Sequence, residues 1–167
     1  SQGDDRVVDF VRAGGSGRAI GGMGEDTLIL ASFDGSGAFV NRKEGVYAAR
    51  VPEGAEGAPG RNVIAGFERY TLTSEDDVYR GNGKKDWVFG SFGMDTLNGL
   101  GKADTLQGGG DDDSLLGAGG GDSLNGNAGD DALLGGGGKD LLRGGEGDDL
   151  LNGGGKRDTA NYSGDAA

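Results

Sequence analysis

The chain has 167 residues and a formal net charge of −12, and 40 of its residues are glycine. Its length suits one domain, with at most a cap, and its charge argues against nucleic acid or an anionic membrane surface as a partner, because their phosphates would repel it. Cysteine and histidine are absent, which excludes disulfides, zinc sites with histidine ligands and histidine-dependent catalysis. We also expect no transmembrane segment, since no apolar stretch is long enough.

The N-terminal part of the chain, up to residue 71, is mostly without a regular period. Residues 38–40 and 46–51 have strand character, and residues 52–60 have the composition of an exposed loop. Aromatic residues gather where this part meets the first regular repeat: Phe67, Tyr70, Tyr79, Trp87, Phe89 and Phe92. They could form a platform for a sugar, or a cap over the open apolar end of a solenoid, and we favour the cap.

From residue 72 to residue 161 aspartate recurs every nine residues, usually after a glycine-rich turn and two places before an apolar residue. A nine-residue period of turn, acid and aliphatic residue predicts a solenoid that stacks its acids. The stacked residues would be Asp77, Asp86, Asp95, Asp104, Asp113, Asp122, Asp131, Asp140, Asp149 and Asp158.

Within one repeat, we expect the first six residues to form a turn, because glycines supply the positive φ values that a tight loop needs. The last three residues should form a short strand whose middle side chain points inward. Strands two repeats apart would pair in parallel, so that 18 residues make one coil with turns along both edges. The inward side chains would be Val88, Leu97, Leu106, Leu115, Leu124, Leu133, Leu142 and Leu151.

Stacking places the carboxylates about 4.7 Å apart, the spacing of neighbouring strands. At an effective dielectric constant of about 20, each such pair would repel by roughly 3.5 kcal/mol. A divalent cation between successive turns converts this repulsion into attraction. Calcium fits best, since it takes six or more hard oxygen ligands, whereas magnesium tends to keep its waters.

Residues 21–29 and 144–152 match the pattern Gly-Gly-x-Gly-x-Asp-x-apolar-x at every fixed position. This unit resembles the nonapeptide of the repeats-in-toxin (RTX) family. The resemblance implies an all-β parallel β-roll in which each calcium ion lies between two turns on the same edge. One edge would hold Asp77, Asp95, Asp113, Asp131 and Asp149, and the other Asp86, Asp104, Asp122, Asp140 and Asp158.

The resemblance further implies that backbone carbonyls complete each site. For the Asp122/Asp140 site these would come from Ala118, Gly120, Gly135 and Gly137, and for the Asp113/Asp131 site from Gly109, Asp111, Gly126 and Ala128. The other candidate turn residues are Gly93, Gly99, Gly101, Gly108, Gly110, Gly117, Gly119, Asn127, Gly129, Gly136, Gly138, Gly144, Glu146, Gly153 and Gly155.

Four pairs on each edge allow at most eight calcium ions, and we expect five to seven. The turn at residues 72–77 has no glycine, which argues against the Asp77/Asp95 site. Elsewhere the glycine two places before the aspartate is replaced by Lys84, Lys102, Asp111 or Lys156. A side chain with positive φ costs about 1 kcal/mol or more, but leaves the carbonyl in place.

The resemblance also implies a block of a longer protein, similar to those of large RTX cytolysins such as adenylate cyclase toxins. Residues 1–20 would be the tail of a preceding block, 21–71 a linking and capping β segment, 72–161 the roll, and 162–167 the start of the next segment. Partners would then be calcium ions, neighbouring RTX blocks and a type I secretion machinery. The protein would be secreted and would fold outside the cell.

Other interpretations remain open. A carbohydrate-binding module, like the RTX-like parts of alginate epimerases, would use the junction aromatics and residues such as Arg80 and Arg143. The chain could instead be the tail of a secreted protease or lipase. In either case we expect no catalysis here, since identical stacked acids without a cleft suit metal ligands better than acid–base chemistry.

Overall fold

The computed structural model describes residues 68–162 apart from residue 82, together with the strands of the preceding part of the chain. The predicted loop at residues 52–60, Phe67, the repeat turn at residues 21–26 and residues 163–167 lie outside the described residues. The upstream strands are β1 (Arg6–Val11), β2 (Arg18–Ile20), β3 (Thr27–Ser32), β4 (Ala38–Asn41), β5 (Val46–Ala49) and β6 (Asn62–Ala65).

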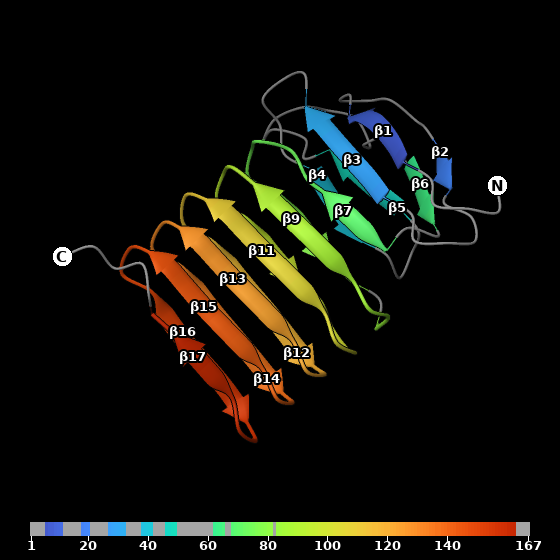
Figure 1. The fold of residues 1–167 in the computed structure, drawn as a ribbon. Helices are drawn as coiled ribbons and strands as arrows, with labels where there is room; N and C mark the ends of the chain where they lie inside the picture. Colours follow the sequence, from blue (N-terminus) through green and yellow to red (C-terminus); the bar gives the residue numbers. More distant parts are fainter. Residues whose placement is uncertain are drawn as a thin grey trace.

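One further strand follows about every nine residues (Figure 1). These are β7 (Arg69–Thr71), β8 (Val78–Arg80), β9 (Trp87–Ser91), β10 (Thr96–Asn98), β11 (Thr105–Gly110), β12 (Ser114–Gly119), β13 (Ser123–Ala128), β14 (Ala132–Gly137), β15 (Leu141–Glu146), β16 (Leu150–Gly155) and β17 (Thr159–Asn161).

Successive strands of the repeat region go alternately to two parallel sheets. One sheet has the order β1-β3-β7-β9-β11-β13-β15-β17, and the other has β16-β14-β12-β10-β8-β4-β5-β6-β2. Partners are 18 residues apart, as in Leu106 with Leu124 and Leu115 with Leu133. The predicted parallel β-roll with an 18-residue coil is therefore confirmed.

Strands of the N-terminal part extend both sheets beyond the first coil of the roll. β3 pairs in parallel with β7, and β4 pairs in parallel with β8. β4, β5 and β6 then form antiparallel pairs, so this end of the nine-stranded sheet departs from the roll pattern. The paired edge of the first coil is thus covered by β structure, as expected of a cap.

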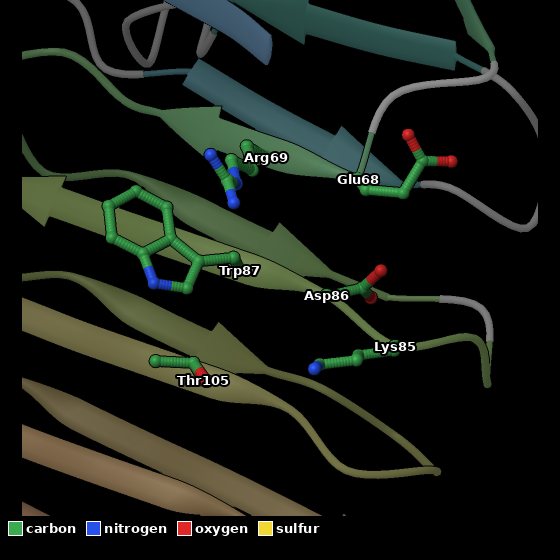
Figure 2. Close-up of a pocket in the computed structure, with 6 residues that line it drawn as sticks. All are labelled: Glu68, Arg69, Lys85, Asp86, Trp87 and Thr105. Atoms are coloured by element: carbon green, nitrogen blue, oxygen red, sulfur yellow. The ribbon is translucent and has the colours of Figure 1, made fainter. Parts of the chain in front are cut away.

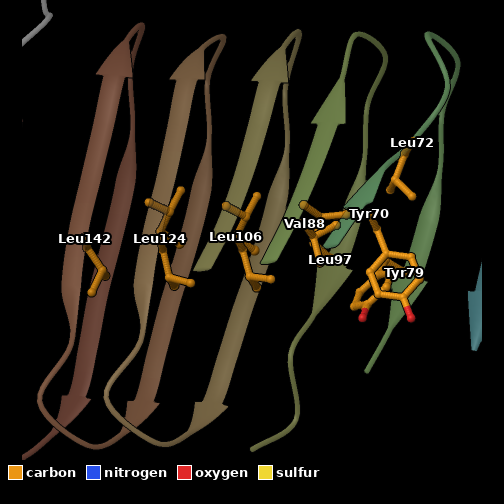
Figure 3. Close-up of a cluster of buried hydrophobic side chains, with 10 residues drawn as sticks. Tyr70, Leu72, Tyr79, Val88, Leu97, Leu106, Leu124 and Leu142 are labelled. Atoms are coloured by element: carbon orange, nitrogen blue, oxygen red, sulfur yellow. The ribbon is translucent and has the colours of Figure 1, made fainter. Parts of the chain in front are cut away.

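Aliphatic side chains from both sheets face one another and fill the space between the sheets (Figure 3). Every predicted inward residue from Val88 to Leu142 is at most 2% exposed, and Leu151 packs against this core. In the first coil Tyr70 and Tyr79 take the same inward position, with ring centroids 5.2 Å apart. Two of the junction aromatics are therefore core residues, which agrees with the cap interpretation.

The strands in the middle of the roll are longer than the three residues predicted from one repeat. β11 to β16 each contain six residues, and their pairing continues into the glycine-rich turn, as at Gly109 opposite Asn127. Glycine permits this because the backbones of successive coils can approach without a side chain between them. A larger share of each repeat is therefore held by interstrand hydrogen bonds.

Candidate metal centre

Two columns of aspartates run along the two edges of the roll. In each column the backbone N–H of one aspartate donates to Oδ1 of the aspartate one coil later, over 2.8 Å from Asp104 to Asp122 and from Asp122 to Asp140. The bond recurs at all eight consecutive pairs. The structure thus brings together the neighbours expected from the sequence, in columns Asp77, Asp95, Asp113, Asp131, Asp149 and Asp86, Asp104, Asp122, Asp140, Asp158.

The column aspartates from Asp77 to Asp140 are buried, although each can carry a charge, and Asp149 and Asp158 are partly buried. Asp95, Asp122 and Asp131 are each only 2% exposed. A second oxygen, Oδ2, is buried without a hydrogen-bond partner in Asp95, Asp113, Asp122, Asp131, Asp140 and Asp149. Burying a polar oxygen in this way costs free energy unless another group compensates. The repeated open oxygen indicates that each coil presents the same binding position for a cation.

A backbone carbonyl lies beside these open carboxylate oxygens. A Cβ atom placed on Gly135 would lie 2.6 Å from Oδ2 of Asp140 and 2.8 Å from the carbonyl oxygen of Gly153. One coil earlier, a Cβ atom on Gly117 would collide with Oδ2 of Asp122 and approach the Gly135 carbonyl to 2.8 Å. In these turns the glycine five residues before the aspartate therefore leaves a space that is bordered by oxygen atoms.

The remaining candidate residues lie in the same turns. A Cβ atom on Gly138 would collide with the Gly120 carbonyl and lie 3.0 Å from Oδ1 of Asp140, so these two oxygens are neighbours. The Ala118 carbonyl lies against the following coil, 3.7 Å from a Cβ atom placed on Gly137. Oxygens of the implied Asp122/Asp140 set therefore share one edge, while their individual roles as ligands stay a prediction.

Of the four replacements named above at the position two places before an aspartate, three have positive φ, as expected: Lys102 at 79°, Asp111 at 72° and Lys156 at 85°. In the Asp86 turn the recorded positive φ belongs to Gly83 instead, at 79°. Further non-glycine residues with positive φ occur four places before an aspartate, among them Ala118 at 72° and Asn127 at 86°. The turn backbone is thus held in a left-handed conformation even where a side chain makes that conformation costly.

Burial and mutual repulsion make several of the column carboxyls harder to ionise without a cation. The pKa of Asp95 is raised to about 8, chiefly by burial and also by the neighbouring carboxylates of Asp77 and Asp113, although a backbone hydrogen bond lowers it. For the same reasons the pKa of Asp113 is raised to about 7 and that of Asp131 to about 6. Burial also raises the pKa of Asp122. A cation bound between the carboxylates would oppose this effect.

The first aspartate of the roll differs from the others. The Thr73 backbone N–H donates to Oδ2 of Asp77 over 2.7 Å, and the Thr73 hydroxyl lies 2.9 Å from Oδ1 of Asp77. Both oxygens of this carboxylate are therefore satisfied by the chain itself. This contact is a second reason, besides the missing glycines, to expect that the Asp77/Asp95 pair binds calcium less well than the other pairs.

The sequence interpretation overlooked several residues at these edges. Gly81 and Gly90 occupy the position of Gly135 in earlier coils, where a Cβ atom would collide with a carbonyl or a column carboxylate. Their place five residues before an aspartate could have identified them. Thr73 was also overlooked, and no sequence signal distinguishes its hydroxyl from that of an ordinary turn threonine.

The donor set fits calcium. Among the described residues, no group of three or more histidine, cysteine, aspartate or glutamate side chains could hold a metal. The predicted positions would instead use two carboxylates, one from each of two successive coils, together with carbonyls of the glycine-rich turns. Such a set of hard oxygen donors at high coordination number is the one that calcium prefers.

No helix within the described part of the chain is long and apolar enough to cross a membrane.

A family model described as the RTX calcium-binding nonapeptide repeat (4 copies) matches residues 73–101, 89–124 and 125–160. A comparison with curated proteins gave no significant match. The matched repeats cover a little over half of the 167 residues and coincide with the coils that carry the two aspartate columns. The chain therefore belongs to the RTX family, and its nonapeptide repeats bind Ca²⁺.

Proposed function

We propose that this chain is a calcium-dependent folding module of an exported protein, with no catalytic role of its own. The observation that carries the proposal is the stack of buried aspartates whose Oδ2 atoms have no hydrogen-bond partner, as in Asp113 and Asp122. Without calcium, these groups oppose the stacking of one coil on the next. With calcium, the free energy of ion binding becomes free energy of folding.

The proposal includes a number of ions. Eight consecutive aspartate pairs are in hydrogen-bond contact, and the Asp77/Asp95 pair is set aside because Thr73 satisfies Asp77. Eight less one leaves seven ions, the upper end of the range expected from the sequence. They would lie between Asp95/Asp113, Asp113/Asp131 and Asp131/Asp149 on one edge, and Asp86/Asp104, Asp104/Asp122, Asp122/Asp140 and Asp140/Asp158 on the other.

The biological setting follows from the family and from calcium dependence together. Where free calcium is scarce, as in a cytosol, the module would remain unfolded and could pass through a type I secretion machinery. In millimolar calcium outside the cell it would fold, next to neighbouring RTX blocks of a secreted cytolysin or adhesin. The module would thus fold only after export.

Circular dichroism and calorimetry test the proposal on the whole chain. In excess chelator at pH 7.5 we expect little β structure, and in millimolar CaCl₂ we expect a large gain of β structure with about seven ions bound. The same concentration of MgCl₂ is the control and should produce little change. Equal β content in chelator and in calcium would contradict the proposal.

One observation favours a second candidate function, binding of a sugar. A pocket of about 160 Å³ on the outer face of the eight-stranded sheet is lined by Glu68, Arg69, Lys85, Asp86, Trp87 and Thr105 (Figure 2). The Trp87 side chain is 37% exposed, and the Arg69 guanidinium lies 6.0 Å from its ring centroid. An exposed indole beside charged and hydroxyl groups suits a saccharide ring.

The variant Trp87→Ala separates the two functions. It should abolish binding to acidic and neutral oligosaccharides on a glycan array, while calcium-induced folding by circular dichroism is retained. Folding without glycan binding in the unsubstituted protein would remove the second candidate and leave the first unaffected.

A further inference from the structure

Alternate repeats send their turns to opposite edges, and the charges outside the aspartate columns are divided between these edges. We call the edge formed by turns 72–77, 90–95, 108–113, 126–131 and 144–149 the acid edge, because its other charged residues are Glu75, Asp76, Asp111, Asp112, Asp130, Glu146 and Asp148. We call the edge formed by turns 81–86, 99–104, 117–122, 135–140 and 153–158 the basic edge, because its others are Lys84, Lys85, Lys102, Lys139, Lys156 and Arg157.

On the acid edge the additional aspartates form a second ladder beside the column. The Asp130 N–H donates to Oδ1 of Asp112, and the Asp148 N–H donates to Oδ1 of Asp130, both over 2.8 Å. The column bonds run the other way, from the earlier coil to a later carboxylate, as from Asp113 to Asp131. The outer carboxylates are thus held in register, each directly before a column aspartate in the chain.

On the basic edge the residues at the equivalent position are Lys85, Ala103, Gly121, Lys139 and Arg157. Lys85, Lys139 and Arg157 are exposed, and each directly precedes a column aspartate. A calcium ion that approaches this edge therefore meets positive charges beside the carboxylates that bind it, whereas an ion that approaches the acid edge meets further negative charges.

We propose that the two edges of the roll are two classes of calcium site, with the acid edge filling at lower calcium concentration than the basic edge. This inference rests on the proposed function and adds to it the order in which the calcium sites of the two edges fill. The roll would first be joined along one edge, as calcium binds between Asp95 and Asp149. It would close along the other edge only at a higher calcium concentration.

The size of the difference follows from Coulomb's law. A unit charge about 8 Å from a divalent ion at the surface changes its affinity about twofold, once screening by physiological salt is included. Several charges of opposite sign act on the two edges, so we expect the two classes to differ about tenfold or more. Because screening weakens this effect, the separation should shrink as salt concentration rises.

The single tryptophan allows the edges to be followed separately in the whole chain. Trp87 directly follows Asp86, a column residue of the basic edge. In a calcium titration the midpoint of Trp87 fluorescence should lie at higher calcium than the first phase in calorimetry. A single class of sites, with both signals at one midpoint, would overturn the inference while calcium-dependent folding, and so the proposed function, still stood.

Charge variants outside the columns complete the test without removing a ligand. The triple variant D112N/D130N/D148N keeps an acceptor oxygen at each position and should weaken the tight phase about eightfold, twofold for each charge removed. The variant K139Q/K156Q/R157Q should strengthen the weak phase by a similar factor. Both shifts should diminish in about 0.5 M salt. Unchanged midpoints in both variants would overturn the inference, whereas absence of calcium binding in the unsubstituted protein would overturn the proposed function itself.

Discussion

The turn at residues 72–77 and the glycine-rich turns that follow it bury the same residue, an aspartate, in two different ways. In the first turn the Thr73 hydroxyl and N–H satisfy both oxygens of Asp77. In a later turn such as residues 117–122, Oδ2 of Asp122 is left without a hydrogen bond and faces a space bordered by a carbonyl. The difference teaches that the fold tolerates a buried acid in either of two states: satisfied by the chain, or available to an ion.

The largest expected effect is the dependence of stability on pH in the absence of calcium. The raised pKa values mean that the folded roll holds protons that the unfolded chain releases, so the stability of the chelated roll falls as pH rises. Their contribution is fully present below about pH 4, near the ordinary pKa of aspartate, and is lost as pH rises through about 6 for Asp131, 7 for Asp113 and 8 for Asp95.

We therefore expect acidification from pH 8 to pH 4 in chelator to restore β structure in part, as measured by circular dichroism. In saturating calcium the dependence should reverse, because protons then compete with the ion for the same carboxylates. A chelated protein whose β content ignores pH over this range would contradict the assignment of the buried acids as the source of instability.

Removing one acid from each class of turn gives the next largest effect. Asp122 is shared between the pairs with Asp104 and with Asp140. We therefore expect Asp122→Ala to bind two calcium ions fewer than the unsubstituted protein, as counted by calorimetry. Asp77→Ala should leave the ion count unchanged, although it removes the Thr73 bonds and lowers the free energy of unfolding by about 1–3 kcal/mol. Loss of only one ion in the first variant, or of any ion in the second, would break the comparison.

Glycine substitutions test whether the space beside the open carboxylate oxygen contributes to this difference between the turns. Gly135→Ala should lower the free energy of unfolding in calcium by about 2–3 kcal/mol, because its Cβ atom would enter the space between Oδ2 of Asp140 and the Gly153 carbonyl. Gly101→Ala is the matched control. Its Cβ atom would meet no atom closer than 3.5 Å, and its φ is not positive, so thermal unfolding should change little. Equal destabilisation by both variants would contradict a particular role for the space beside Asp140, because the loss of glycine entropy in the unfolded chain would by itself stabilise the fold.

The smallest expected effect is in the first turn. Thr73→Val removes the hydroxyl that lies 2.9 Å from Oδ1 of Asp77 and should cost about 1 kcal/mol by denaturant titration. Thr73→Ser keeps the hydroxyl and serves as the control. Both variants should bind as many calcium ions as the unsubstituted protein. An additional ion in Thr73→Val would show that the hydroxyl alone keeps calcium from this turn.

Much of the fold could be derived from the sequence because it follows from a period. An apolar residue two places after each aspartate, as at Leu106 and Leu124, must fall on the inner face if the strand alternates. A fixed nine-residue spacing then returns it to the same place in every second repeat. The same reasoning correctly placed Asp104, Asp122 and Asp140 in one column. Local geometry and exact repetition are sufficient for these features.

Only the tertiary structure decided what each group meets in the next coil. The six-residue length of the strands depends on backbone pairing within the glycine-rich turns, as at Gly109 opposite Asn127 and Gly136 opposite Ala118. The role of Thr73 depends on its hydrogen bond to the Asp77 carboxylate. The second ladder depends on the hydrogen bond from the Asp130 N–H to the Asp112 carboxylate. These are contacts of a few ångströms, and a nine-residue pattern fixes which residues lie on an edge but not which of their atoms come within hydrogen-bond distance.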